Sequence, residues 1–274
     1  MTPAAARVRP PAVAGTFYAS PPAELAADVD ALMAVTPSTS DTDVPKALVV
    51  PHAGYLYSGP VAAAGYARLA PGRGRIHRVV LLGPAHFAPV RGVAVSSADA
   101  FATPLGDLTV DTYARDELTS IPFVTVDDAA HREEHGLEVH LPFLQRVLGD
   151  VQVLPLLIGV ATPDEVGEVL DRVWGGPETA IIVSSDLSHY LDDAAARRAD
   201  AATADAILAV DPARIGTDDA CGVFPLRGLL QTARRRELGI ELIALANSAD
   251  TAGSPERVVG YGAFALTEPS APSP

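Results

Sequence analysis

The sequence lacks residues that several protein classes require, with one cysteine, Cys221, and one lysine, Lys46, among 274 residues. A lone cysteine excludes an intramolecular disulfide framework and is typical of a reducing compartment, so we predict a cytoplasmic protein. The formal net charge of −14 and the scattered arginines argue against a nucleic-acid surface. No apolar run approaches the roughly 20 residues that cross a bilayer, and prolines interrupt the start of the chain, where a signal peptide needs an apolar stretch. We therefore predict neither a membrane nor a nucleic-acid partner.

The chain is rich enough in apolar residues to bury a core, at 48% hydrophobic content. Strand-like and helix-like segments alternate along it, which is the pattern of an α/β fold. We find no internal repeat and no internal boundary. The sequence therefore predicts one α/β domain over residues 1–267, followed by a disordered proline- and serine-containing tail over 268–274.

Local signals place the elements that matter for function. Thr162 to Glu165 form a capping box with proline in the first helical position, so a helix is predicted to begin there. Residues 101–106, FATPLG, are predicted to form a loop between two short strands. The remaining elements are predicted as helices at 22–35 and 59–69, strands at 46–50, 78–82 and 180–183, a last long helix from Cys221 to about Gly239, and two closing strands.

Three of the apolar strand-like runs lead into short segments that carry a histidine. His52 follows ALVV, His86 follows RVVLL, and His189 follows AIIV. Ligands of open α/β sheets bind beyond the carboxyl ends of the parallel strands, so we expect these imidazoles to converge. Imidazole and thiolate are preferred ligands of borderline and soft transition metals, and Cys221 supplies the one thiol. The pattern indicates a metal site at this edge of the sheet.

Cys221 is predicted to lie at the start of the last long helix. The helix dipole would lower the pKa of a thiol there and favour the thiolate, which is the form that binds metal. Two alternatives stay open at this point. Cys221 could be a redox-active thiol, or a small apolar residue buried in the core.

Asp186 and His189 lie three residues apart in SSDLSH. A carboxylate beside an imidazole fixes its tautomer and raises its basicity, so we predict a catalytic pair with His189 as acid/base and Asp186 supporting it. The alternative is that this segment only caps the next helix, because serine and aspartate are common N-caps. Tyr57 is predicted to contact a substrate, although the ring could instead pack against the sheet.

Several longer blocks, in this order and spacing, resemble the Memo family. They are PHAGYLYSGPVAAAGY, LGPAHF, TPLG, EEHGLEVHLPFL, SSDLSHY, ACGVFPL and GYGAFAL. The resemblance implies a three-layer α/β/α sandwich with a central mixed, largely parallel sheet, similar to the catalytic subunits of class III extradiol dioxygenases. It also implies AMMECR-like and radical SAM proteins as partners, because bacterial members are encoded beside them.

The same resemblance implies a non-haem metal centre formed by His52, His86 and Cys221, with His189 beside it. Fe(II) or Cu is expected in preference to Zn, and a small molecule or peptide is expected in the pocket. Glu134 and His135 of EEHGLEVH are expected to line that pocket as substrate-binding residues. The predicted function is a metal-dependent, dioxygenase-like oxidoreductase whose substrate stays open.

Two other functions compete with this prediction. His131 to His135 match H-x-x-E-H, the motif of inverted zinc peptidases, which needs both histidines on one helical face; Gly136 and Pro142 leave little helix there. A non-catalytic module could instead use the same pocket to bind a peptide or protein. A phosphopeptide would require an arginine cluster, and only Arg91 and Arg227 lie near the histidine and cysteine segments in sequence.

Overall fold

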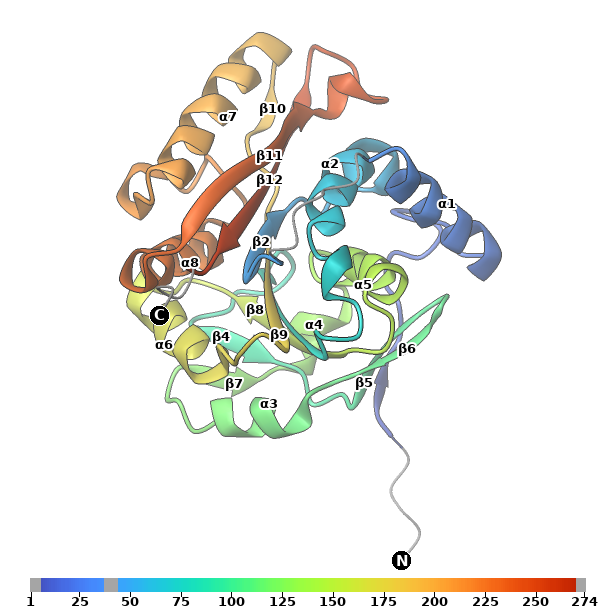
Figure 1. Ribbon diagram of the computed structural model, residues 1–274, viewed down its shortest axis with the longest axis vertical. Helices are drawn as coiled ribbons and strands as arrows, with labels where there is room; N and C mark the ends of the chain where they lie inside the picture. Colours follow the sequence, from blue (N-terminus) through green and yellow to red (C-terminus); the bar gives the residue numbers. More distant parts are fainter. Residues whose placement is uncertain (1–5, 37–43, 270–274) are drawn as a thin grey trace, which may run out of the picture.

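A mixed β-sheet forms the centre of the computed structural model, which describes residues 6–36 and 44–269 (Figure 1). Within these residues the strands hydrogen-bond in the order β10-β12-β2-β9-β3-β8-β4-β7, and β11 pairs with β12. Their bounds are β2 Ala47–Val50, β3 Arg78–Pro84, β4 Val93–Val95, β7 Val124–Val126, β8 Gln152–Ile158, β9 Thr179–Ser184, β10 His189–Leu191, β11 Gly239–Asn247 and β12 Val258–Thr267.

The middle of this sheet is parallel. Strands β2, β9, β3 and β8 run in one direction, whereas β12 pairs antiparallel with β2, and β4 pairs antiparallel with β8. Side chains of the buried strands alternate between the two faces of the sheet, so Leu48 and Val50 belong to one apolar cluster and Ala47 and Val49 to another. Because β2, β3 and β9 are parallel, their carboxyl ends lie at one edge of the sheet.

Helices cover both faces of the sheet (Figure 1). Helices α1, α2 and α5 contribute to the cluster with Leu48, and α3, α6 and α8 to the cluster with Val49, while α7 packs on β11 and β12. The predicted three-layer α/β/α sandwich is confirmed. Among the helices of the described residues, none has the length and apolar character that crossing a membrane requires. The bounds are α1 Pro22–Ala34, α2 Tyr55–Ala67, α3 Thr112–Leu118, α4 Asp128–Arg132, α5 Leu141–Val147, α6 Pro163–Val173, α7 Asp193–Leu208 and α8 Val223–Arg236.

A second, small sheet joins the N-terminal segment to the middle of the chain. Strand β1, Val8–Arg9, pairs parallel with β5, Ala100–Thr103, which pairs antiparallel with β6, Gly106–Thr109. The predicted loop over 101–106 is therefore wrong in its first half. Because β5 takes its second partner from the distant N-terminus, local sequence gave no sign of it.

Helix boundaries agree with the local signals where a cap is present. The capping box at Thr162 is confirmed, with the side chains of Thr162 and Glu165 each bonded to the backbone of the other. Helix α2 begins at Tyr55, four residues before the predicted start, with Gly54 as its cap. Tyr55 is buried, and its hydroxyl donates to the carbonyl of Val139 (2.7 Å). Most of the predicted tail, 270–274, lies outside the described residues, while Glu268 accepts a hydrogen bond from Trp174.

Candidate metal centre

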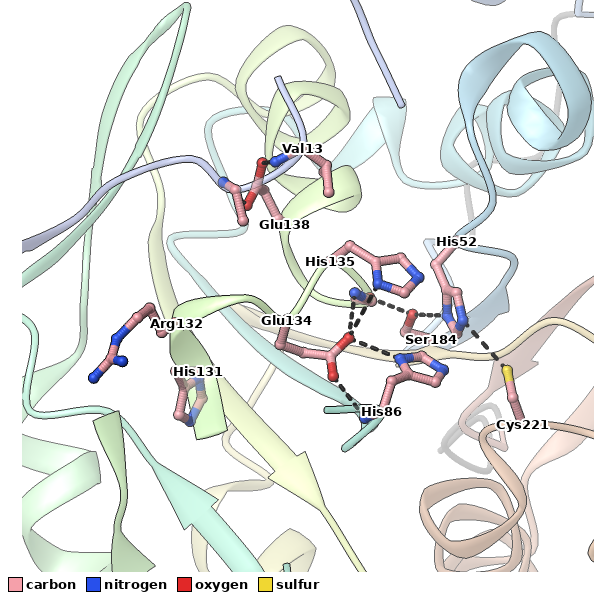
Figure 2. A network of polar contacts seen from close by, with 12 residues as sticks. Val13, His52, His86, His131, Arg132, Glu134, His135, Glu138, Ser184 and Cys221 are labelled. Atoms are coloured by element: carbon pink, nitrogen blue, oxygen red, sulfur yellow. Dashed lines mark hydrogen bonds and ion pairs between the residues drawn. The ribbon is translucent and has the colours of Figure 1, made fainter. Parts of the chain in front are cut away.

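Three histidines meet beyond the carboxyl ends of the parallel strands. His52 follows β2, His86 follows β3, and His135 lies between α4 and the 3-10 turn Glu138–His140. Within the described residues, these are the one group of three or more potential ligands whose donor atoms all lie within 4.8 Å of one another. Their rings surround a common space in Figure 2, with centroids 4.8–5.5 Å apart.

The predicted convergence is seen for His52 and His86, whereas His189 lines the same pocket outside this close group, and His135 takes the third place. Burial lowers the pKa of both His52 and His135, which favours the neutral imidazole that can donate a lone pair to a metal. His135 was predicted to bind substrate. Its position among the donor atoms makes it a candidate ligand as well.

Glu134 holds His86 from behind. Its buried carboxylate accepts hydrogen bonds from the ring Nδ1–H of His86 (2.8 Å), from the backbone N–H of His86 (2.7 Å) and from the N–H of Gly136 (2.8 Å). Burial alone would raise the pKa of Glu134, but the bonds from His86 and Gly136 lower it below its ordinary value. A carboxylate only accepts, so His86 carries its proton on Nδ1 and presents Nε2 to the common space.

Ser184, the last residue of β9, occupies the corresponding place behind His52. Its Oγ lies 2.6 Å from His52 Nδ1 and 2.8 Å from Nε2 of the buried His140, and it also contacts the carbonyl of Gly136. Gly136 therefore contacts the outer partners of both histidines, because its N–H donates to Glu134 and its carbonyl accepts from Ser184. Sequence reasoning missed Ser184, because a serine at a strand end gives no signal of such contacts.

Cys221 lies beside this group without belonging to it. Its Sγ is 3.3 Å from His52 Nε2 and accepts a hydrogen bond from the backbone N–H of Asp186 (3.2 Å). The predicted lowering of the thiol pKa is wrong, because burial and then the Asp186 carboxylate raise it. Helix α8 begins only at Val223, with Gly222 as its cap, so Cys221 precedes the helix it was predicted to open.

Asp186 and His189 both line the pocket, but Asp186 does not hold the ring of His189 as predicted. The Asp186 carboxylate accepts the backbone N–H of His52 (2.8 Å), and burial raises its pKa to about 7. The ring of His189 bonds through Nδ1 to the carbonyl of Leu187 (2.8 Å), which leaves Nε2 as a proton acceptor. The alternative role as a helix cap is also wrong, since Asp192 caps α7 and β10 intervenes.

The H-x-x-E-H motif does not form the helical site of a zinc peptidase. Helix α4 ends at Arg132, before His135, and His131 is buried with its Nε2–H donating to the carbonyl of Ala94 (3.0 Å). His131 is absent from the group of close ligands. The match is therefore a coincidence of spacing.

A pocket of about 1080 Å³ opens over the three histidines. His189, Asp186, Cys221 and Tyr57 line it as well, whereas the carboxylate of Glu134 is enclosed behind His86. Sequence reasoning missed other lining residues, among them Phe17, Tyr190, Ser254 and Arg257. They come from distant segments of the chain that share no motif.

Comparison with known proteins places this pocket in a family context. A family model described as "Memo-like protein" matches residues 9–265. A "MEMO1 family protein" of Aquifex aeolicus (strain VF5) is 35% identical over 93% of this chain and 97% of its own length. Another, of Methanococcoides burtonii, is 38% identical over 94% and 99%. A solved structure of an uncharacterised Escherichia coli K12 protein is similar with a TM-score of 0.49 and 15% identity, over 78% of this chain and 98% of that one.

Proposed function

Because this chain belongs to the Memo family, we propose that it is a metal-dependent redox enzyme whose metal ion is held by His52, His86 and His135. The observation that carries the proposal is the convergence of three imidazoles at the floor of a large pocket. The pocket has room for a small organic substrate next to these rings. The substrate itself is left open.

The donor set fits a first-row transition metal. Such an ion lies about 2.0–2.1 Å from imidazole nitrogens, so two of its nitrogen ligands lie at most about 4.2 Å apart. The donor nitrogens of the three imidazoles lie within 4.8 Å of one another, so small ring movements would bring them to one ion, and the Cys221 thiol next to His52 offers a further, softer ligand. Imidazole with sulfur suits copper and iron as well as zinc, and we propose Fe(II) or Cu because the redox role requires an ion that changes oxidation state.

The protein's own residues have separate tasks in this proposal. Glu134 and Ser184 hold the rings of His86 and His52, while His189 presents its Nε2 to the pocket and accepts a proton from the substrate. When bound, the metal ion would supply electron transfer and polarisation of the substrate. Tyr57, an exposed residue of the pocket wall, is proposed to contact the substrate.

A peptide-binding module is the second candidate, and one feature of the pocket rim favours it. The exposed ring of Tyr190 lies beneath the guanidinium of Arg257, 4.3 Å from the ring centroid to Cζ. Both residues line the pocket, so an aromatic surface and a cation are present where an anionic peptide could bind.

The metal content of protein purified anaerobically from cells supplied with iron, copper and zinc tests the proposal. We expect near-stoichiometric iron or copper in the wild type, and loss of metal in His86→Ala and His135→Ala. His77→Ala is the matched control, because His77 is exposed and remote from the group. Zinc as the resident metal would refute the redox role. Folded wild type without metal, even after reconstitution, would refute the metal centre and favour the binding module.

A further inference from the structure

The hydroxyl of Ser184 has more partners than a buried serine usually has. Its side chain is fully buried, and Oγ contacts two imidazole nitrogens and one backbone carbonyl. The partners are His52 Nδ1, His140 Nε2 and the oxygen of Gly136. They come from the turn after β2 and from the segment that precedes α5, so Ser184 connects parts of the chain that are distant in sequence.

Counting protons decides the direction of every bond in this cluster. A hydroxyl has one proton and two acceptor lone pairs, and a carbonyl oxygen only accepts. Two oxygens in hydrogen-bond contact must share a proton, so the Ser184 proton points to Gly136. Both imidazole nitrogens must then donate to Oγ. His52 therefore carries its proton on Nδ1, and His140 carries its proton on Nε2.

The electrostatics agree with this assignment. Both rings are buried, which disfavours their charged form, and a neutral imidazole carries a single N–H. With Nδ1 of His52 protonated, its lone pair lies on Nε2. That nitrogen faces Cys221, 3.3 Å from Sγ, on the side of the common space (Figure 2).

We propose that Ser184 is a positioning residue that fixes His52 in the Nδ1–H tautomer and so directs the Nε2 lone pair into the metal site. Ser184 does for His52 what Glu134 does for His86, with a neutral hydroxyl in place of a carboxylate. The role in metal binding rests on the proposed function, whereas the tautomer does not.

Gly136 is the link that makes the arrangement possible. Its carbonyl accepts a hydrogen bond from the Ser184 hydroxyl, and its N–H donates to the Glu134 carboxylate, so one residue orients both Ser184 and Glu134. A Cβ at this position would lie 3.2 Å from Glu134 Oε1, 3.4 Å from His86 Cε1 and 3.6 Å from His52 Nδ1. A Cβ there would crowd the Glu134 carboxylate and would come into van der Waals contact with both rings.

The first test is the histidine tautomer in metal-free wild type, from long-range ¹H–¹⁵N correlation spectra assigned with His52→Gln and His140→Gln. We expect a protonated Nδ1 and an unprotonated Nε2 for His52, and the reverse for His140. An Nε2–H tautomer of His52 in the wild type would overturn the proposal, whether or not any variant folds.

The second test compares variants for Fe(II) affinity under anaerobic conditions. Ser184→Ala should lose the fixed tautomer and bind Fe(II) about 10–100-fold more weakly, and Ser184→Thr, which keeps the hydroxyl, should restore both. Thr203→Val is the control, since it removes a buried hydroxyl that donates to Ala199 on α7, away from the histidines. Unchanged affinity in folded Ser184→Ala would refute the positioning role. Correct tautomers in a wild type that binds no metal would refute the proposed function alone.

Discussion

Replacing Glu134 with glutamine probes the site most directly, because the change keeps the shape of the side chain and removes its charge. Three N–H groups point at the carboxylate, so the amide of glutamine must turn its own NH₂ toward at least one of them. A hydrogen bond to a charged group contributes about 1.5–3 kcal/mol, and the metal-free variant should lose stability of that order. Urea denaturation measures this loss.

The same substitution should weaken metal binding, because the ring of His86 loses its fixed orientation and part of its basicity. Loss of an outer partner of a metal-bound histidine costs about 10–100-fold in affinity, or about 1.4–2.8 kcal/mol. Anaerobic Fe(II) titration of Glu134→Gln measures the effect, and Glu133→Gln, an exposed neighbour, is the control.

A double-mutant cycle separates this mechanism from general destabilisation. If Glu134 acts through His86, then Glu134→Gln should weaken the residual Fe(II) binding of His86→Ala, measured by titration, much less than it weakens binding by the wild type. Equal losses in the two backgrounds, or unchanged affinity in folded Glu134→Gln, would refute the reasoning.

Two further predictions concern buried groups outside the ligand set. Glu138→Gln should reduce the free energy of unfolding by about 3–5 kcal/mol. The reason is that the buried carboxylate pairs with the Arg9 guanidinium and accepts hydrogen bonds from the backbone N–H groups of Ala12 and Val13. Urea denaturation measures the loss, and a value below about 1 kcal/mol would contradict the prediction. The second prediction is that His131 makes the protein less stable in acid, because burial lowers the pKa of this histidine from 6.5 to about 4. The unfolded chain takes up this proton first, so stability is complete above pH 6.5 and falls toward pH 4, by up to about 3 kcal/mol. His131→Gln keeps a donor for Ala94 without titrating, so between pH 6.5 and pH 4 it should lose less stability than the wild type does. Urea denaturation of both proteins at these two pH values measures the losses, and an equal loss in the two proteins would contradict the prediction.

Much of the fold could be predicted because its signals are local. The capping box at Thr162 and the apolar runs of β2, β3 and β9 each identify an element without reference to the rest of the chain. Strand β5 was missed because its pairing with β1 joins residues about ninety positions apart. The backbone of such a short strand is specified by its partners rather than by its own sequence.

The candidate site, too, could be predicted only where its residues follow local signals. His52 and His86 were predicted as ligands because each directly follows a buried strand, and strand order then brings them together. His135 follows no strand of the sheet, and its place depends on the contacts of Glu134 and Gly136, which sequence does not show. The thiol pKa of Cys221 was misjudged because desolvation of the thiol and the nearby Asp186 carboxylate both raise it, and neither can be read from the position of the residue before a helix.

The segment 134–140 connects the candidate metal site to residues 9–13, which we call the N-terminal arm. Glu134 holds His86, Gly136 orients Glu134 and Ser184, and Glu138 holds the arm through Arg9 and the N–H groups beyond it. Only one 3-10 turn supports this segment, so its side-chain bonds fix its path. Releasing Glu138 should therefore loosen the support of the metal ligands as well as the arm. Fe(II) affinity of Glu138→Gln decides this: weaker binding follows from a shared support, whereas full affinity in the folded variant would mean that the arm and the metal site are held independently.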